Sequence, residues 1–411
     1  MKFLRDQLDR VAPLFEKGGK LEKLYPIYEA QDTILFTPGE VTKGKTHVRD
    51  ALDLKRMMIM VVVALVPAIL MALYNTGLQA NTLIHGGNAQ PLDAWQTSLF
   101  HAIAGSYEPT LINNVLHGAM WFIPLFAITG IVGGLVEVVS AIKRGHEVNE
   151  GFLVTMFLFP LSLPPTLPLW QAGLGIAFGV IFAKEVFGGT GMNVLNVALT
   201  GRAFLFFAYP GQISGDQPWI AATVTDGASG ATWLAQFAAD GTLAKSLESA
   251  GTLGQTWLNG FWGFVPGSMG ETSAFACLLG AAILIASQIG SWRTMIGVAV
   301  GTAATGFLLN AVAGEASAAI YHMPWYFHFV LGGWAFGTVF MATDPVTSAF
   351  TEKGKLVYGF MIGVMVVLVR VVNPAYPEGM MLAILFMNMF APLIDHVFVQ
   401  ANIKRRVARG S

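Results

Sequence analysis

The chain has 411 residues, of which 54% are hydrophobic and 12% charged, and its mean hydropathy is +0.58. This composition excludes an ordinary soluble domain, because the apolar residues are gathered into runs long enough to span a bilayer as helices. The single cysteine, Cys277, excludes an internal disulfide and a four-cysteine iron–sulfur cluster supplied by this chain alone. The net charge of -1 carries no information about partners, and we expect no nucleic acid among them.

The first 56 residues are polar and basic. They hold eleven Lys and Arg residues ahead of the first apolar run, so we expect no cleavable signal peptide. Apolar residues near helical spacing predict an amphipathic helix that stops at Gly18-Gly19, and they are Phe3, Leu4, Leu8, Val11, Leu14 and Phe15. Such a helix can lie in the membrane interface, although the spacing favours a lid packed on the cytoplasmic loops.

Ten apolar runs follow, and each predicts a transmembrane helix. Their approximate ranges are 57–74, 114–142, 152–168, 170–187, 193–209, 272–290, 293–313, 324–342, 355–373 and 378–399. The third and fourth are the weakest because four prolines crowd around them, and the fifth carries Arg202. The predicted fold class is an all-α polytopic membrane protein of about ten helices.

Basic residues are concentrated in alternate loops. Lys and Arg occur in 1–56, at Lys143–Arg144, at Arg293, at Lys353 and Lys355, and from Lys404 to Arg409, whereas 75–113 and 314–323 have none and 210–271 has only Lys245. The positive-inside rule therefore predicts cytoplasmic termini and an external segment 210–271. The expected division is a basic extension (1–56), a five-helix half (57–209), an external loop (210–271), a second five-helix half (272–399) and a cytoplasmic tail (400–411).

Five helices on each side of an external loop predict an inverted repeat, because the second half enters the membrane with the opposite orientation. Gly and Pro residues near the third and fifth helices of each half faintly support this symmetry. We expect broken helix ends to meet near the midplane and to form a site for a ligand or ion.

Five motifs occur in order along the chain. They are His146-Glu-Val-Asn-Glu-Gly151, Gly188-Gly-Thr-Gly191, Asp226-Gly-Ala-Ser-Gly-Ala-Thr232, Thr343-Asp-Pro345 and Asn373-Pro-Ala-Tyr-Pro-Glu-Gly379. Together they resemble the B subunits of the Na+-translocating NADH:quinone oxidoreductases (Na+-NQR), and the likeness covers nearly the whole chain. The basic N-terminal extension distinguishes the chain from the related D subunit of the Rnf complex, which is shorter.

The resemblance implies that Thr232 carries FMN through a phosphoester to its hydroxyl. Gly230 and Ala231 leave the backbone open to a transferase, while Asp226 shapes the turn or assists the transferase, and Ser229 completes the motif. Without the resemblance, a Ser/Gly/Ala/Thr stretch indicates only a flexible loop. We expect the Thr232 side chain to be exposed in this loop.

The resemblance also implies a noncovalent riboflavin toward the cytoplasmic side, near Asn193 and Asn196, with Arg202 placed to contact it. Amide side chains suit the polar edge of an isoalloxazine ring. Both asparagines can equally cap the start of the fifth helix. The family often has proline after the second asparagine, and Val197 stands there in this chain.

Ubiquinone is the implied final acceptor. The family's inhibitor-sensitive segment matches Gly133 and Gly134, with Glu137 one turn further on. Two glycines can open a groove for a flat headgroup, and Glu137 can supply a proton or bind a cation. Close helix packing through small residues explains the glycines equally well.

The remaining intramembrane charges need partners, water or a function. We expect Lys184 and Asp344 to reach water at cytoplasmic helix ends, and Arg370 to bond to carbonyls at a helix break. Sodium needs several oxygen ligands, so break carbonyls and the hydroxyl of Thr343 or Thr347 are candidates. The sequence does not distinguish among these candidate sodium ligands.

The predicted function is a redox subunit of a sodium-pumping NADH:quinone oxidoreductase in the bacterial inner membrane. It would carry electrons from covalent FMN through riboflavin to ubiquinone, coupled to Na+ export. No dinucleotide-binding motif is present, so NADH oxidation falls to a partner among the A, C, D, E and F subunits of the complex. The alternatives are a non-redox transporter or channel with an inverted repeat, and the Rnf D subunit.

Overall fold

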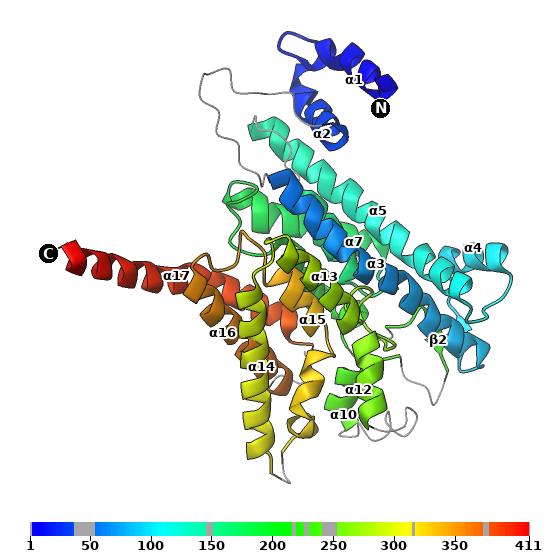
Figure 1. Ribbon diagram of the computed structural model, residues 1–411. Helices are drawn as coiled ribbons and strands as arrows, with labels where there is room; N and C mark the ends of the chain where they lie inside the picture. Colours follow the sequence, from blue (N-terminus) through cyan, green and yellow to red (C-terminus); the bar gives the residue numbers. More distant parts are fainter. Residues whose placement is uncertain are drawn as a thin grey trace.

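The computed structural model describes residues 2–36, 54–144, 151–215, 219–225, 230–240, 253–314, 317–372 and 378–410. These residues are mostly helical (Figure 1). The helices are α1 (Lys2–Phe15), α2 (Tyr25–Leu35), α3 (Leu54–His85), α4 (Trp95–Ala104), α5 (Leu111–Arg144), α6 (Gly151–Leu161), α7 (Leu169–Phe178), α8 (Val197–Ala208), α9 (Pro210–Ile213), α10 (Trp233–Asp240), α12 (Leu253–Trp262), α13 (Ala274–Ala286), α14 (Trp292–Val312), α15 (Trp334–Phe336), α16 (Glu352–Val372) and α17 (Met380–Gly410). Strands β1 (Ala89–Pro91) and β2 (Ala222–Val224) pair antiparallel, with Gln90 opposite Thr223.

Six helical segments in the described residues are long and apolar enough to cross a membrane, so the chain is a multi-pass membrane protein. They are Met57–His85, Leu111–Arg144, Leu169–Phe187, Trp292–Val312, Glu352–Val372 and Met380–Arg409. Three more predicted spans are shorter apolar helices, α6, α8 and α13. The tenth, 324–342, is a broken element made of a 3₁₀ turn (Trp325–Phe329), α15 and a π-helical turn (Gly337–Met341).

The interruptions have local causes. α6 ends at Leu161, just before the proline-rich stretch 164–168. The element at 324–342 breaks at Gly332 and Gly333, whose φ angles of 65° and 66° belong to the left-handed region that glycine tolerates. Broken backbone is tolerated at membrane depth where protein surrounds it. The prolines noted in the sequence account for the first break, whereas the single helix predicted over 324–342 is corrected to a broken element.

Glycines allow the long helices to cross closely. A Cβ atom added to Gly297 would meet the Leu356 carbonyl oxygen at 2.6 Å, and one added to Gly363 would meet the Thr302 nitrogen at 2.6 Å, so α14 and α16 pack backbone against backbone. α3 and α5 cross in the same way at Gly77 and Gly118 and run side by side (Figure 1). These contacts make a rigid frame around the shorter helices.

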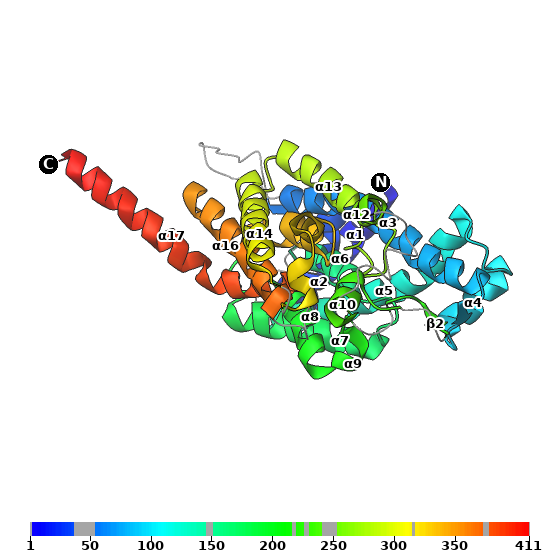
Figure 2. The same cartoon turned by 90° about the horizontal axis from the view of Figure 1, so that it is seen from below.

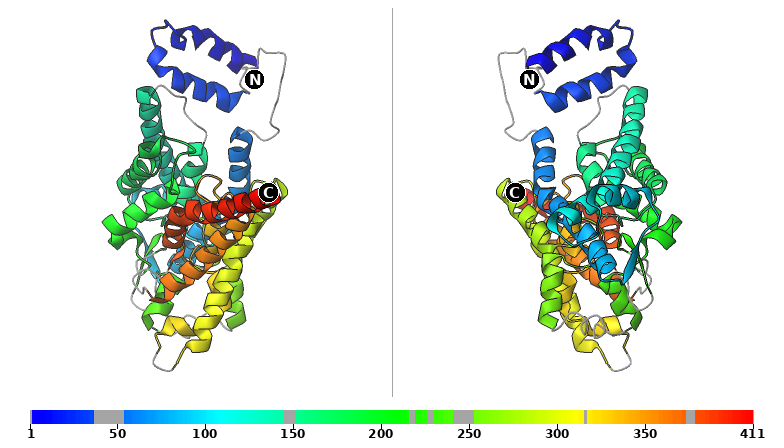
Figure 3. Two further views of the ribbon diagram at one scale, coloured as in Figure 1. Left: turned by 90° about the vertical axis from the view of Figure 1, so that its left-hand side faces the viewer. Right: turned by 90° about the vertical axis from the view of Figure 1, so that its right-hand side faces the viewer.

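The segment predicted as an external loop is packed structure where it is described. It contains α9, β2, α10 and α12, and its buried residues include Trp219, Ile220 and Leu234. α10 and α12 lie at the end of the molecule opposite to α1 and α2 (Figures 1 and 3). The expectation of an exposed loop is therefore wrong for these residues, because apolar side chains such as Trp219 and Leu234 belong to the hydrophobic core of the protein.

The N-terminal helix predicted from its spacing is present as α1. It packs on α2, with Arg5 Nη1 2.6 Å from Asp32 Oδ1 and Phe15 stacked on Tyr28. Phe3 and Leu4 remain exposed on α1. At the other end of the chain, the second half of α17 projects away from the remaining helices (Figures 1 and 2).

Candidate functional site

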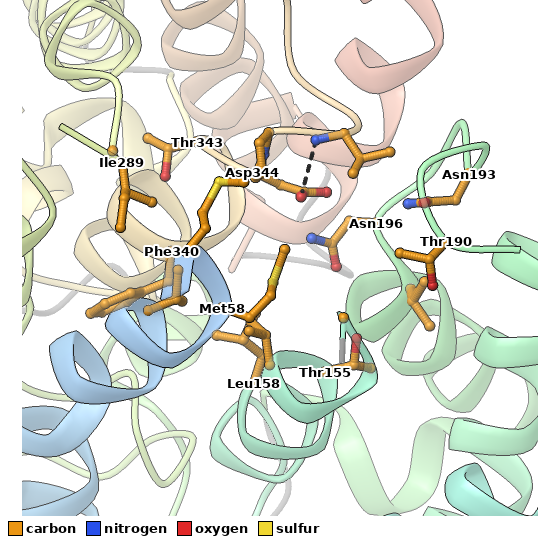
Figure 4. A pocket seen from close by; sticks show the side chains of 18 of the residues that line it. Met58, Thr155, Leu158, Thr190, Asn193, Asn196, Ile289, Phe340, Thr343 and Asp344 are labelled. Carbon is orange, nitrogen blue, oxygen red and sulfur yellow. Dashed lines mark hydrogen bonds between the residues drawn. The ribbon is translucent and has the colours of Figure 1, made fainter. Parts of the chain in front are cut away.

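A cavity lies where the start of α3, the α6 helix and the break before α8 face the end of α13 and the break after Met341. It holds about 810 Å³, part of it open to the outside. Figure 4 shows side chains from both halves of the chain around this space. We call it the inner cavity, and its lining includes Met58, Thr155, Leu158, Lys184, Thr190, Asn193, Asn196, Ile289, Phe340, Thr343 and Asp344.

Asn196 serves as the N-cap of α8 and also lines the inner cavity. Its Oδ1 accepts from the Leu199 N–H at 3.1 Å, and its carbonyl accepts from the Thr200 hydroxyl at 2.8 Å. Its Nδ2 makes no hydrogen bond with the described residues. The capping and ligand-binding interpretations are therefore compatible for this residue, since each uses a different atom of the amide.

Asn193 uses its amide nitrogen for a local hydrogen bond, whereas Asn196 uses its amide oxygen. Its Nδ2 donates to the Leu195 carbonyl at 3.2 Å, while its Oδ1 has no partner among the described residues. With these amide orientations, which the hydrogen bonds assign, the cavity wall offers one free acceptor from Asn193 and one free donor from Asn196. A ligand that carries both a donor and an acceptor can use these two atoms.

Thr190 is a cavity residue that sequence reasoning did not select. Its buried Oγ1 finds no hydrogen-bond partner within the described part of the chain, although buried polar atoms normally have one. The sequence signal that could have identified it is its place in the Gly188-Gly-Thr-Gly191 motif. The three glycines take φ angles of 122°, 99° and 86°, which allow the tight turn that carries Thr190. This hydroxyl is available to hydrogen-bond a molecule in the cavity.

Asp344 and its neighbours form part of the opposite wall. The Asp344 carboxylate accepts from the Thr347 hydroxyl at 2.7 Å. It also accepts from the Val346 N–H at 3.3 Å (Figure 4). Thr343 donates to the Val339 carbonyl at 2.6 Å. Both threonines proposed for sodium thus donate their protons locally, which leaves their oxygen lone pairs as acceptors. Among the described residues, no three His, Cys, Asp or Glu side chains gather as a metal site.

Lys184 lies in the inner cavity wall and forms an ion pair with Glu137 of α5. Both side chains are buried, so the expectation that Lys184 reaches water is wrong. Neither charge is stable alone at this depth, and the pair satisfies both. The pair also connects the cavity to the helix face that carries Gly133 and Gly134.

The two adjacent glycines have different surroundings. A Cβ atom on Gly133 would collide with the Phe152 ring and meet Ile176 at 3.1 Å, whereas one on Gly134 would find only Phe152 Cε1 at 3.9 Å. Gly133 is thus required for packing, as the alternative interpretation holds, and Gly134 leaves open space beside the Phe152 ring. Of the two glycines, only Gly134 has the open space that the predicted groove needs.

Thr232 lies on a second, smaller cavity, which we call the outer cavity. It holds about 370 Å³ including open space and is lined by Thr232, Val265, Ser268, Glu271, Thr272, Val330, Gly332, Gly333 and Glu378, among others. The Thr232 side chain is 5% exposed, and its Oγ1 accepts from the Ala235 N–H at 3.3 Å. The expected exposed threonine is therefore wrong, because Thr232 caps α10.

Of the neighbouring motif residues, Gly230 and Ala231 belong to the described part of the chain. The Gly230 carbonyl accepts from the Trp219 N–H at 2.7 Å, and the Ala231 carbonyl accepts from the Gln236 side chain at 2.7 Å. Asp226 and Ser229 lie outside the described residues. The bonds at Gly230 and Ala231 hold the approach to Thr232 in one conformation.

Arg202 lies on the side of α8 that faces the outer cavity. It pairs with Glu271 at 2.7 Å and donates to the Ser268 hydroxyl at 3.2 Å, and both partners line the outer cavity. It is not among the residues that line the inner cavity. Grouping Arg202 with Asn193 and Asn196 is therefore corrected, because the helix carries Arg202 away from its capped end.

Arg370 bonds to carbonyls at a helix break, as expected. Its guanidinium donates to the carbonyls of His328, Leu331, Gly332 and Glu378 at 2.8 to 3.1 Å. This fully buried cation holds together the break that forms the floor of the outer cavity.

The two cavities lie at opposite ends of α13. Glu271 and Thr272 precede this helix in the outer cavity, and Leu284 near its end lines the inner one. Thirteen residues at about 1.5 Å each span roughly 20 Å. The cavities are thus separated by roughly the length of α13.

Comparison with known proteins gives a consistent assignment. The model of the NQR2, RnfD, RnfE family matches residues 41–404. The B subunit of the Na+-translocating NADH-quinone reductase of Chromohalobacter salexigens is 55% identical over 407 residues, covering 99% of this chain and 96% of the relative. The corresponding subunits of Yersinia pestis and Pseudomonas aeruginosa are 54% identical over 417 and 409 residues, covering 99% of each chain. The chain therefore belongs to the NQR2, RnfD, RnfE family, within the branch formed by the B subunits of Na+-translocating NADH-quinone reductases.

Proposed function

We propose that this subunit holds one flavin at each end of α13 and conducts electrons between them to ubiquinone, while the complex exports Na+. The outer cavity would hold FMN bound to Thr232, and the inner cavity would hold riboflavin. A flavin supplies one- and two-electron redox chemistry at its site. The chain's own residues position the rings, exclude water and satisfy their polar edges.

The observation that carries the proposal is the pair of free amide atoms in the inner cavity. The pyrimidine edge of an isoalloxazine ring presents an N–H donor beside carbonyl acceptors. The free Oδ1 of Asn193 complements that donor, and the free Nδ2 of Asn196 complements a carbonyl. The unsatisfied Thr190 hydroxyl adds a third polar contact, and Leu158 and Phe340 supply apolar surface for the ring.

The outer cavity fits an FMN phosphoester for a different reason. Thr232 directly precedes α10, so a phosphate on its Oγ1 would lie at a helix N-terminus, where backbone N–H groups and the helix dipole favour negative charge. The carboxylate of Glu271 is compensated by Arg202. The glycines at 332 and 333 let the side chains of Leu234, Glu378 and Glu271 pack directly against the backbone at the floor of the cavity.

We place the ubiquinone site beside Gly134 and Phe152. Lys184 lines the inner cavity while it pairs with Glu137, which lies one turn from Gly134 on α5. A quinone headgroup in this groove would therefore be close to the inner flavin. The Glu137 carboxylate is the group in this region that can donate or accept a proton.

The basic clusters support cytoplasmic termini and an external Thr232, and α1–α2 and α10 lie at opposite ends of the molecule (Figure 1). The second half of the chain then runs inverted relative to the first, and the five-plus-five repeat is part of the proposal. Electrons from NADH would arrive from the other members of the complex, the A, C, D, E and F subunits.

The test uses two substitutions at Asn196 that keep its capping oxygen. Asn196→Ser and Asn196→Asp both preserve a good N-cap but remove the Nδ2 donor. In the purified complex we expect riboflavin affinity to fall about tenfold for Ser and further for Asp, with covalent flavin unchanged. Measurement of acid-extractable flavin decides the matter. Full extractable flavin in both variants would remove Asn196 from the site, and a wild-type subunit without any flavin would support a non-redox transporter instead.

A further inference from the structure

A buried pair of polar side chains links the second half of the chain to Asn196. Tyr358 on α16 and Asn388 on α17 are 0% and 1% exposed. With the Asn388 amide oriented by its neighbours, its Nδ2 donates to the Tyr358 Oη at 2.6 Å and to the Ile384 carbonyl at 3.2 Å. Its Oδ1 then accepts from the Asn196 backbone N–H at 3.1 Å. Both Nδ2 hydrogens and one lone pair of Oδ1 of Asn388 are then used, each with a partner of the right kind.

The hydrogen bond from Asn388 is made to Asn196, which lines the inner cavity. The Asn196 carbonyl and Oδ1 are held by α8 itself, through Thr200 and Leu199. The N–H is the remaining backbone group, and it is bonded to Asn388 on the other half of the molecule. The only group of Asn196 left without a partner in the described chain is therefore Nδ2, which belongs to the cavity wall.

The opposite side of α8 is held by packing. A Cβ atom on Gly179 would meet the Val197 carbonyl oxygen at 2.6 Å, and one on Gly201 would meet the Gly175 carbonyl oxygen at 2.6 Å. The first turns of α8 thus lie directly on the backbone of 175–179. This contact sets how closely α8 approaches its neighbour, and the Arg202–Glu271 pair holds the helix further along. Asn388 adds a directional hydrogen bond at the Asn196 end itself.

We propose that Tyr358 and Asn388 are positioning residues for the inner flavin, holding Asn196 so that its Nδ2 points into the cavity; this inference rests on the proposed riboflavin site. Tyr358 orients the Asn388 amide, and Asn388 orients the start of α8. The relay crosses from the second half to the first, so a shift of α16 or α17 is transmitted to the flavin contact. Affinity and electronic environment of the flavin then depend on two residues that do not touch it.

The test compares Asn388→Leu and Tyr358→Phe with Asn81→Leu in the whole complex. Asn81 is a matched control, because its buried amide also joins two helices, bonding to Asn114 at 2.9 Å, but away from either cavity. We expect riboflavin to bind about tenfold more weakly in Asn388→Leu and about threefold more weakly in Tyr358→Phe. The reduction potential of the remaining extractable flavin should shift in both. Asn81→Leu should alter neither quantity.

The outcomes separate the two proposals. If Asn196→Ser depletes extractable flavin while Asn388→Leu and Tyr358→Phe retain wild-type affinity and potential, the positioning role is wrong and the flavin site stands. If none of these variants changes extractable flavin, the site itself is wrong. If Asn81→Leu loses flavin as fully as Asn388→Leu, the effect is general destabilisation and the relay is rejected. Should Asn388→Leu prevent assembly, Tyr358→Phe, which removes a single oxygen, still gives the affinity and the potential.

Discussion

Some side chains in this protein use one polar atom for a local hydrogen bond and leave another free for the cavity. Asn196 uses Oδ1 to cap α8 and leaves Nδ2 for the inner cavity, while Asn193 leaves the complementary oxygen. Thr232 differs, because the oxygen that accepts from the Ala235 N–H is also the proposed attachment point. Replacing such residues by alanine removes both purposes together, so the informative substitutions are those that keep one.

Thr232 can be tested in this way. Thr232→Ala should abolish covalent flavin and also destabilise α10 by about 0.5–2 kcal/mol, because the cap is lost. Thr232→Asn should abolish covalent flavin without that cost, since asparagine caps well but has no hydroxyl. Thr232→Ser should keep both properties. In-gel flavin fluorescence of the denatured subunit and the thermal stability of the complex measure the two effects, and covalent flavin on the Asn variant would show that another residue is the attachment site.

At the scale of elements, short and broken helices create the cavities that continuous helices would fill. α6 stops before the proline-rich stretch, α8 starts late at Asn196, and the element at 324–342 opens at Gly332-Gly333. Each of these breaks contributes residues to one of the cavities or stands beside it. The long helices contribute the frame, and α13 sets the distance between the two sites.

The face of α5 provides an element-scale prediction. Gly134→Val should weaken inhibitor and quinone binding while the complex assembles, because the added side chain fills open space beside Phe152. Gly133→Val should instead lower stability by about 1–3 kcal/mol, because it collides with the Phe152 ring. Inhibitor titration and thermal unfolding of both variants separate binding from packing. Equal inhibitor affinity in wild type and Gly134→Val would locate the quinone elsewhere.

On the scale of the whole molecule, the two cavities and the two termini define a direction across the membrane. The predicted topology places the end with α1 and α2 in the cytoplasm and the end with α10 outside. An electron taken up at the outer cavity must then travel most of a hydrocarbon core of about 30 Å. A second redox group in the inner cavity would shorten that path, which is the physical reason why we propose two flavins in one subunit.

Single-cysteine labelling tests this direction. Cys277 is fully buried, so a Cys277→Ala background leaves no native thiol. The labelling uses cells whose outer membrane is permeabilised and whose inner membrane is intact. Glu108→Cys, in the loop before α5, should react there with a membrane-impermeant maleimide. Lys404→Cys should react only after lysis. Both positions are exposed. The reverse pattern would invert the assigned orientation and place Thr232 in the cytoplasm.

The sequence by itself determined the membrane class, the family and most helix positions, because long apolar runs and ordered motifs are local properties. It also indicated where helices break, since proline and glycine act on their own neighbourhood. It did not determine that Thr232 is buried, that Lys184 pairs with Glu137, or that Arg202 belongs to the outer cavity with Glu271. Nor could it separate Gly133 from Gly134 or connect Asn388 to Asn196. These facts depend on which helices become neighbours, and burial, ion pairing and shared hydrogen bonds exist only once residues far apart in the chain are packed together.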